Sequence, residues 1–273
     1  MILLRKILLT FVCIFVALGL VGCIKKKNTQ DLLRTVQERG KIVAGVKYDA
    51  KPFGFIDKDQ NLKGFDVELI KEVAKRVLGN ENAVEFQQVT SSNRIFSLTS
   101  GTVDLVAATM SVTPRRRDII DFSRPYYIAG QAIMVPKNSS IKTLKDLSGK
   151  CVIVVLGSTS EINIKQLVPD AKILGFRTYT DAFFALKSGR GDALTTDDTI
   201  IYGFLSEDPD FKVLKDRLTR EPYGIGFRKG MATQAFQDSV DSALEQIMQD
   251  GTLRRLQRKW MVTYLSQSKE KTN

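Results

Sequence analysis

The sequence predicts an α/β protein with two lobes, and two observations support that prediction. From Lys41 onward, short β-branched runs alternate with segments of helical periodicity, as expected where strands of a parallel sheet alternate with helices. The same pattern starts again after Pro136 without a sequence repeat. A chain of 273 residues has room for two units of about 100 residues each. We therefore expect each lobe to be built on its own sheet.

The first unit begins with an apolar run over 42–46, which predicts a strand. Residues 65–78 predict a helix, because they carry one apolar stripe and Gly79 follows as a stop signal. The other predicted elements are strands over 83–89 and 103–108, a short helix over 93–100, and a helix that opens at Thr113-Pro114, with proline in its first position.

The second unit repeats this order of elements. Ser158, with Glu161 three residues later, forms a capping-box pattern that predicts a helix start. The other predicted elements are strands over 151–155, 172–176 and 192–195 and a helix over 181–188. We predict that the chain crosses between the units near 126–131 and returns near 223–227, giving two hinge crossings.

The closing helices, predicted over 234–249 and 253–264, carry an apolar stripe that would pack back on the first unit. These boundaries define the predicted domains, which are lobe 1 over 40–126 and 227–265, lobe 2 over 127–226, and a polar, flexible tail over 266–273.

The N-terminus predicts export. Arg5 and Lys6 precede an apolar run over 7–21, which is shorter than the roughly 20 residues of a membrane span and is typical of a signal peptide. The run ends Leu20-Val21-Gly22-Cys23, which resembles the lipobox of bacterial lipoproteins. That resemblance implies cleavage after residue 22 and a diacylglycerol on Cys23. Residues 23–39 would then link the lobes to the outer side of the cytoplasmic membrane.

The charge of the chain is strongly positive. The formal net charge is +11, and removal of Arg5 and Lys6 with the signal leaves +9. An exported chain is not expected to meet nucleic acid, so we interpret the excess as a basic surface toward anionic lipid headgroups, to which 25–27 would contribute. Cys151 is the one thiol left after export and acylation, so we expect no internal disulfide.

The residue types argue against an enzyme. The chain has no histidine, which excludes Ser-His-Asp and Cys-His nucleophiles and all histidine-based metal sites. A single free cysteine cannot build a zinc site. Asp197 and Asp198 are adjacent, so in an extended segment their side chains point to opposite sides. We expect no catalytic residues, no metal and no cofactor.

Ligands of open parallel sheets bind beyond the carboxyl ends of the strands. The groups at those ends suit a zwitterion, because Arg116 can clamp a carboxylate with two parallel N–H bonds and Asp197 can accept from an ammonium. Thr109 and Ser111 would complete the carboxylate shell, and the helix start at Ser158 offers amides to an anion. The predicted ligand-binding residues are Lys47, Ser91, Arg94, Thr109, Ser111, Arg116, Ser158, Thr159 and Asp197.

From about residue 40 to residue 264 the chain resembles the extracytoplasmic solute-binding proteins of polar amino acid ABC importers. The stretches that carry the resemblance are Gly64-Phe65-Asp66-Val67-Glu68, Ser111-Val112-Thr113-Pro114-Arg115-Arg116, Asp121-Phe122-Ser123-Arg124-Pro125-Tyr126-Tyr127, Gly157-Ser158-Thr159 and Asp192-Ala193-Leu194-Thr195-Thr196-Asp197.

The resemblance implies the two-lobed type II periplasmic-binding fold and hinge closure on the ligand. It also implies a membrane permease with its ATPase subunits as partners, and we expect the receptor itself to be a monomer. By motif position, Arg116 would bind the ligand α-carboxylate and Asp197 its α-ammonium. Arg115 and Arg117 lack that spacing and are interpreted as solvated.

The pocket positions favour an acidic side chain. Members that bind glutamine or basic amino acids place an acid three residues before an aromatic in the first loop, where this chain has Lys47 and Ala50. Ser91 replaces a second aromatic, and the Asn93-Arg94 pair resembles the members that bind acidic amino acids. Three cations against Asp197 give the site a charge of +2, which suits an anion such as glutamate or aspartate.

Other interpretations stay open. Glutamine or another polar amino acid would leave the cations underpaired without being repelled. An exported dehydratase on the same fold would need an acid/base pair in the cleft. A sensory module would be expected to carry fused segments after Tyr264, and a ligand that is not an amino acid is a further alternative.

Overall fold

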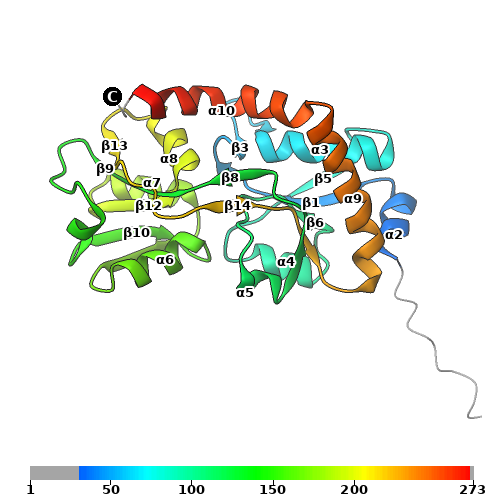
Figure 1. The fold of residues 1–273 in the computed structure, drawn as a ribbon, viewed down its shortest axis with the longest axis horizontal. Coiled ribbons are helices and arrows are strands. Elements are labelled where there is room, and N and C mark those ends of the chain that lie inside the picture. Colours follow the sequence, from blue (N-terminus) through cyan, green and yellow to red (C-terminus); the bar gives the residue numbers. More distant parts are fainter. Residues whose placement is uncertain (1–30, 271–273) are drawn as a thin grey trace, which may run out of the picture. The chain divides into compact units, whose positions relative to one another are not determined.

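The computed structural model describes residues 31–270, with side chains for 31–261. The predicted signal peptide over 1–22, the acylated Cys23 and the linker as far as residue 30 lie outside the described residues, as do 271–273. The described part contains two five-stranded sheets, each with helices on its faces (Figure 1). We call the first sheet with its helices lobe 1 and the second lobe 2, and the predicted two-lobed α/β fold is confirmed.

Lobe 1 is built from residues on both sides of lobe 2 in the sequence. Its elements are α2 (Leu32–Arg39), β1 (Ile42–Val46), β2 (Asp49–Ala50), β3 (Gly54–Ile56), β4 (Leu62–Lys63), α3 (Phe65–Leu78), β5 (Val84–Gln88), α4 (Arg94–Thr99), β6 (Leu105–Val106), α5 (Pro114–Arg117), β7 (Ile120–Phe122), β15 (Gly226–Arg228), α9 (Met231–Gln249) and α10 (Thr252–Glu270).

The sheet of lobe 1 has the order β5-β1-β6-β15-β7. β1 runs parallel to β5 and β6, whereas β15, which returns from lobe 2, is antiparallel to its neighbours. The carboxyl ends of β1 and β6 therefore lie at one edge of the sheet, which faces lobe 2 (Figure 1). The strand over 42–46 and the helix over 65–78 have the predicted bounds.

Lobe 2 is continuous in the sequence. Its elements are β9 (Gln131–Pro136), the 3₁₀ helix η1 (Leu144–Leu147), β10 (Cys151–Val155), α6 (Thr159–Leu167), β11 (Lys172–Phe176), α7 (Tyr179–Lys187), β12 (Ala193–Asp197), α8 (Asp198–Leu205) and β13 (Phe211–Val213). The sheet order is β11-β10-β12-β9-β13, with β10 parallel to β11 and β12.

Two strands connect the lobes. β8 (Tyr127–Ala129) leads from lobe 1 to lobe 2 and β14 (Glu221–Tyr223) leads back, and they pair antiparallel with Tyr127 opposite Tyr223. They run side by side between the lobes (Figure 1). The predicted number and position of the crossings agree with this ribbon, while the exact domain boundaries stay a prediction.

Several elements escaped the sequence analysis. α2 and the small β2-β3-β4 sheet lie in segments to which no element was assigned. α8 follows β12 directly, and six of its eight residues are buried, so no polar face marks it as a helix. α10 extends to Glu270, so the tail predicted to start at residue 266 is helical as far as residue 270.

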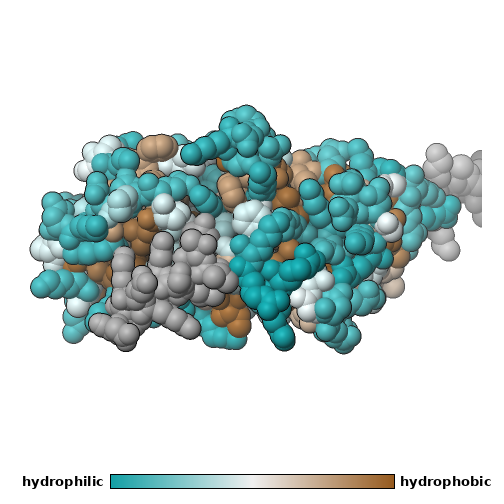
Figure 2. All heavy atoms as spheres, turned by 90° about the horizontal axis from the view of Figure 1, so that it is seen from above, coloured by the Kyte–Doolittle hydropathy of each residue, from teal (hydrophilic) through white to brown (hydrophobic). Residues whose placement is uncertain are grey.

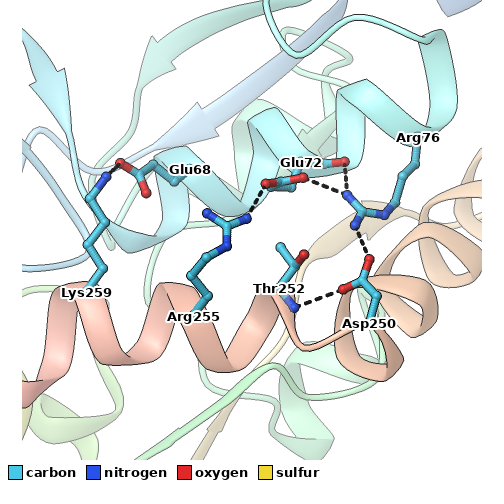
Figure 3. Close-up of polar contacts among 7 residues, drawn as sticks. All are labelled: Glu68, Glu72, Arg76, Asp250, Thr252, Arg255 and Lys259. Carbon is cyan, nitrogen blue, oxygen red and sulfur yellow. Dashed lines mark hydrogen bonds and ion pairs between the residues drawn. The ribbon is translucent and has the colours of Figure 1, made fainter.

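α10 packs on α3 and α9 of lobe 1 and reaches α8 of lobe 2. A row of ion pairs fastens it to α3, with Lys259 on Glu68 and Arg255 on Glu72 at 2.8 Å (Figure 3). Arg76 joins Glu72 to Asp250 at the start of α10. The face that carries α10 is largely hydrophilic (Figure 2). Ion pairs as exposed as these contribute about 0–1 kcal/mol each, so the apolar contacts beneath hold the helix.

Within the residues that the structure describes, no helix has the length and apolar character needed to cross a bilayer.

Candidate functional site

The nine predicted site residues lie where the strand ends of the two lobes face one another. Eight of them are buried, and Thr159 is partly buried. The cluster contains a lysine and two arginines, which are rarely buried in proteins without a partner. Such a concentration of buried charge indicates a site that meets a charged ligand.

Arg116 is aimed into the cleft by a short, well-capped helix. The Thr113 hydroxyl accepts from the Arg116 amide at 3.2 Å, and Pro114 occupies the first position of α5. Of the three consecutive arginines only Arg116 is buried, whereas Arg115 and Arg117 are exposed, as the motif spacing predicts.

The Arg116 guanidinium joins the two lobes. Its Nη1 donates to the Ser111 carbonyl at 2.8 Å, and its Nη2 donates to the Gly157 carbonyl of lobe 2 at 3.1 Å. Burial, and next the neighbouring charge of Arg94, lower the pKa of Arg116 to about 9. An anion placed against this group would relieve both effects.

Thr109 follows β6 in a strained conformation. Its φ of +49° lies in the left-handed region, which costs a threonine about 1–3 kcal/mol. Two contacts hold it there, since its amide donates to Asp66 Oδ2 at 3.0 Å and its carbonyl accepts from Arg94 Nη1 at 3.2 Å. The same Nη1 also donates to the Ala108 carbonyl at 2.6 Å. Thr109 is thus held between Asp66 and Arg94 in the cluster.

Lys47 directly follows β1 and is 1% exposed. Its Nζ donates to the Ser91 hydroxyl at 2.8 Å, and no carboxylate of the described residues forms an ion pair with it. Burial, and then the charge of Arg94, lower the pKa of Lys47 to about 7. A buried ammonium without an anion is costly, so this position favours a ligand that brings one.

Asp197 ends β12 and precedes α8. The Tyr223 hydroxyl, from hinge strand β14, donates to its Oδ2. Burial raises the pKa of Asp197 to about 7, against the effect of the Tyr223 bond. Asp198 turns the other way and pairs with Arg217 at 2.6 Å, so the two aspartates point apart as predicted.

Several buried atoms in and around this cluster have no hydrogen-bond partner among the described residues, and three of them belong to predicted site residues. These three are Asp197 Oδ1, Arg94 Nε and Thr109 Oγ1. Buried polar groups in proteins are nearly always paired, and unpaired ones ask for an explanation. Here they supply one acceptor and two possible donors, which a small polar ligand could satisfy.

The lobes meet across the cleft. Besides the Arg116 bond to Gly157, the Ser111 and Thr159 hydroxyls lie 3.4 Å apart. Gly157 has a φ of +79°, and a Cβ on it would lie 2.7 Å from the Ser92 Cα of lobe 1. A groove of 840 Å³ runs along this junction, lined from both lobes by Ser91, Arg116, Gly157 and Thr159 among others.

Ser158 is the N-cap of α6, where the sequence predicts a helix start. Its hydroxyl accepts from the Glu161 amide at 3.1 Å, and its own amide donates to the Val155 carbonyl. The Glu161 carboxylate takes the Gly157 amide at 2.8 Å instead of completing the predicted capping box. Ser158 thus caps the start of α6, and its hydroxyl, which only accepts in this bond, keeps its own proton as a donor.

The sequence analysis missed further carboxylates and an aromatic residue. Asp66, at the start of α3, is fully buried, and burial raises its pKa to about 6 while Arg94 and Lys47 lower it. Glu221 on β14 is buried and acts on Arg116, but Asn163 and Thr219 already donate to it. The predicted site charge of +2 is therefore too high. Tyr179 of lobe 2 also lies in the cluster. Its ring centroid is 5.1 Å from the Lys47 Nζ.

The cluster offers charge and hydrogen bonds but little chemistry. No group of three or more Asp, Glu, Cys or His suited to a metal ion occurs among the described residues. The arrangement offers the Arg116 guanidinium, the Asp197 carboxylate and the Lys47 amino group to a ligand. Such an arrangement can bind a small zwitterion.

Comparison with known proteins gives three consistent likenesses. The family model for bacterial extracellular solute-binding proteins, family 3, matches residues 42–263. The ABC transporter glutamine-binding protein GlnH of Bacillus subtilis is 39% identical over 245 residues, which cover 89% of each chain. The glutamate-binding protein GluB of Corynebacterium efficiens is 31% identical over 258 residues, covering 90% of this chain and 87% of that one.

Among solved structures, the cysteine-binding protein of Campylobacter jejuni superposes with a TM-score of 0.82 at 30% identity. The match covers 86% of this chain and 94% of that one.

Proposed function

Since the chain belongs to family 3 of the bacterial extracellular solute-binding proteins, we propose that the amino acid it binds is acidic, glutamate or aspartate. The chain is an amino-acid-binding receptor of an ABC import system and not an enzyme, in line with its relatives. The permease, its ATPase subunits, a monomeric state and acylation of Cys23 belong to the proposal. The observation that carries the choice of an acidic ligand is Lys47, a buried lysine that forms no ion pair with a carboxylate of the described residues.

The common part of the ligand is held by both lobes. The α-carboxylate would lie against the Arg116 guanidinium, with the Thr109 and Ser111 hydroxyls beside it. The α-ammonium would lie on Asp197 Oδ1, which is buried and unpaired. Because Arg116 comes from lobe 1 and Asp197 from lobe 2, any bound amino acid would bridge the cleft and favour closure.

The side chain of the ligand would extend toward Lys47 and Ser91. A second carboxylate there would pair with the Lys47 ammonium and remove the cost of its burial. Arg94 stands between the two ends, and because its Nη1 is bonded to the Ala108 and Thr109 carbonyls, its part is to hold Thr109 and add positive charge. A cationic ligand such as arginine would face like charges in this pocket.

Glutamine is the second candidate, and one observation favours it. The relative GlnH, at 39% identity, is a glutamine-binding protein. With a pKa of about 7, Lys47 can also be neutral in the closed cleft, where an amide group suits it better than a carboxylate does.

The two candidates predict different responses to pH. Burial, and next the charge of Arg94, lower the pKa of Lys47 from its ordinary value of 10.5 to about 7 in the cleft. We therefore expect that closing on glutamine releases the Lys47 proton between these pH values. Glutamine binding should therefore tighten as pH rises through this window. A second carboxylate keeps the proton on Lys47, so glutamate binding should stay level. We expect the glutamate-to-glutamine affinity ratio to fall by up to about tenfold per pH unit above 7.

Isothermal titration calorimetry with both ligands between about pH 7 and 8.5 measures this ratio. The other charged and titratable groups that face Lys47 are the same with either ligand, so they do not distinguish the two complexes. They are Arg94, Arg116, Asp49, Asp66 and Tyr179. Asp197 meets the same ammonium in both complexes, so its titration cancels in the ratio. In the control variant Lys47→Met the ratio should not change with pH. A wild-type ratio that is flat or rises with pH would contradict the proposal.

A further inference from the structure

Tyr179 lies three residues beyond the carboxyl end of β11, a strand end that the sequence analysis did not include. It is the first residue of α7 in lobe 2, and its side chain is 2% exposed although tyrosine usually keeps its hydroxyl in water. Its ring centroid lies 5.1 Å from the Lys47 Nζ of lobe 1. This distance is within the range of a cation–π contact, and the contact joins the lobes at the end of the cleft that holds Lys47.

The Tyr179 phenol is surrounded by predicted site residues and their neighbours. Burial raises the pKa of Tyr179 and Asp197 raises it further, whereas Arg94 and the hydroxyls of Ser91 and Thr196 lower it. The ring therefore lies among groups from both lobes. A side chain that extends from the Arg116 and Asp197 end toward Lys47 would meet it.

A carboxylate of lobe 1 fixes the position of Tyr179. The Tyr179 amide donates to Asp49 Oδ2 at 2.6 Å. The N-cap of α7, Thr178, accepts from the Asp181 amide at 3.0 Å and so leaves the first amide of the helix free for Asp49. Asp49 lies on β2, two residues after Lys47, so one short segment carries both the ammonium and the group that positions the ring.

We infer that Tyr179 is a specificity-determining residue that closes the side-chain end of the cleft, and that Asp49 is its positioning residue. This inference rests on the proposed function for the direction in which the ligand lies. The ring sets the length of side chain that fits between Asp197 and Lys47. It selects glutamate against its homologue 2-aminoadipate, which is longer by one methylene.

The test is the ratio of the affinities for glutamate and 2-aminoadipate, measured by calorimetry on the whole chain. One extra methylene in a closed pocket changes affinity by about 10- to 200-fold, which we expect for the wild type. Tyr179→Ala should lower this ratio at least about tenfold, because it opens the end of the pocket. Tyr179→Phe keeps the ring and should keep the ratio. Tyr179→Leu replaces the alanine variant if thermal unfolding shows that the latter is not folded.

The role of Asp49 is tested with variants of Asp49 itself, and a variant of another contact between the lobes serves as the control. Asp49→Ala should lower the ratio, and Asp49→Asn should restore it, because an amide oxygen still accepts from the Tyr179 amide. Lys51 pairs with Glu207 across the lobes at 3.0 Å, a contact that does not include Tyr179, so Lys51→Ala should weaken both ligands equally. A Tyr179→Ala ratio within about threefold of wild type would overturn the inference, as would an equal loss of ratio in Lys51→Ala and Asp49→Ala.

The proposed function and this inference fail separately. If the wild type binds glutamine more tightly than glutamate, the acidic ligand is wrong. The same variants then compare glutamine with its homologue longer by one methylene, and the inference stands or falls on that ratio.

Discussion

Arg116→Ala is expected to abolish binding of glutamate, aspartate and glutamine alike. All three ligands carry the α-carboxylate that Arg116 would clamp, and the guanidinium is 7% exposed, so water cannot take its place in the closed cleft. Removing one partner of a buried, hydrogen-bonded charge pair costs about 2–5 kcal/mol, which corresponds to roughly 30- to 4000-fold in affinity. Calorimetry with each ligand measures the loss.

The neighbouring arginine provides the control for this variant. Arg117 is exposed and lies outside the groove between the lobes. Arg117→Ala should bind all three ligands with affinities within about threefold of wild type. The assignment of Arg116 would be withdrawn if Arg116→Ala, shown to be folded by circular dichroism, bound glutamate within tenfold of the wild-type affinity.

Gly157→Ala is expected to weaken every ligand by about 100-fold or more, by a different mechanism. An added Cβ would lie 2.7 Å from the Ser92 Cα and 2.8 Å from the Ser91 carbonyl oxygen, which are backbone atoms of the opposite lobe. Backbone cannot yield as a flexible side chain does, so the lobes would stop short of full contact. The Arg116 bond to the Gly157 carbonyl would then be lost with the closed state.

Gly149 is a matched control, because its φ of +71° resembles the +79° of Gly157 but a Cβ there would meet nothing within 4 Å. Gly149→Ala carries the same backbone strain and should leave affinity unchanged. Small-angle X-ray scattering should show that ligand compacts the wild type and Gly149→Ala but not Gly157→Ala. Compaction of Gly157→Ala with wild-type affinity would show that closure does not need this contact.

The features that sequence reasoning located best are those with local causes. α3 follows from an apolar stripe that ends at Gly79, and the start of α5 follows from Thr113 and Pro114. The choice of Arg116 over Arg115 and Arg117 rests on the family motif that the sequence resembles. The strand ends were a sound guide to the site, because the rule for parallel sheets depends only on strand direction.

The features that it missed depend on contacts between distant segments. Asp66 lies at a helix start and enters the site because its carboxylate binds the Thr109 amide, 43 residues away. Tyr179 enters it because the two lobes meet. The search of strand ends did not include the end of β11, which lies three residues before Tyr179. The site charge was overestimated because the carboxylates of Asp66 and Glu221 were not counted. The motif stretch that contains Asp66 was a signal, but it was used for the family and not for the site.

The most direct test of the account compares glutamate with glutamine on the wild-type chain by calorimetry near pH 7, with Lys47→Met beside it. We expect glutamate to bind at least about tenfold more tightly, because only its second carboxylate neutralises the buried Lys47, and we expect Lys47→Met to lose that preference. Tighter binding of glutamine by the wild type, or an unchanged preference in Lys47→Met, would contradict the central claim that Lys47 selects an acidic ligand.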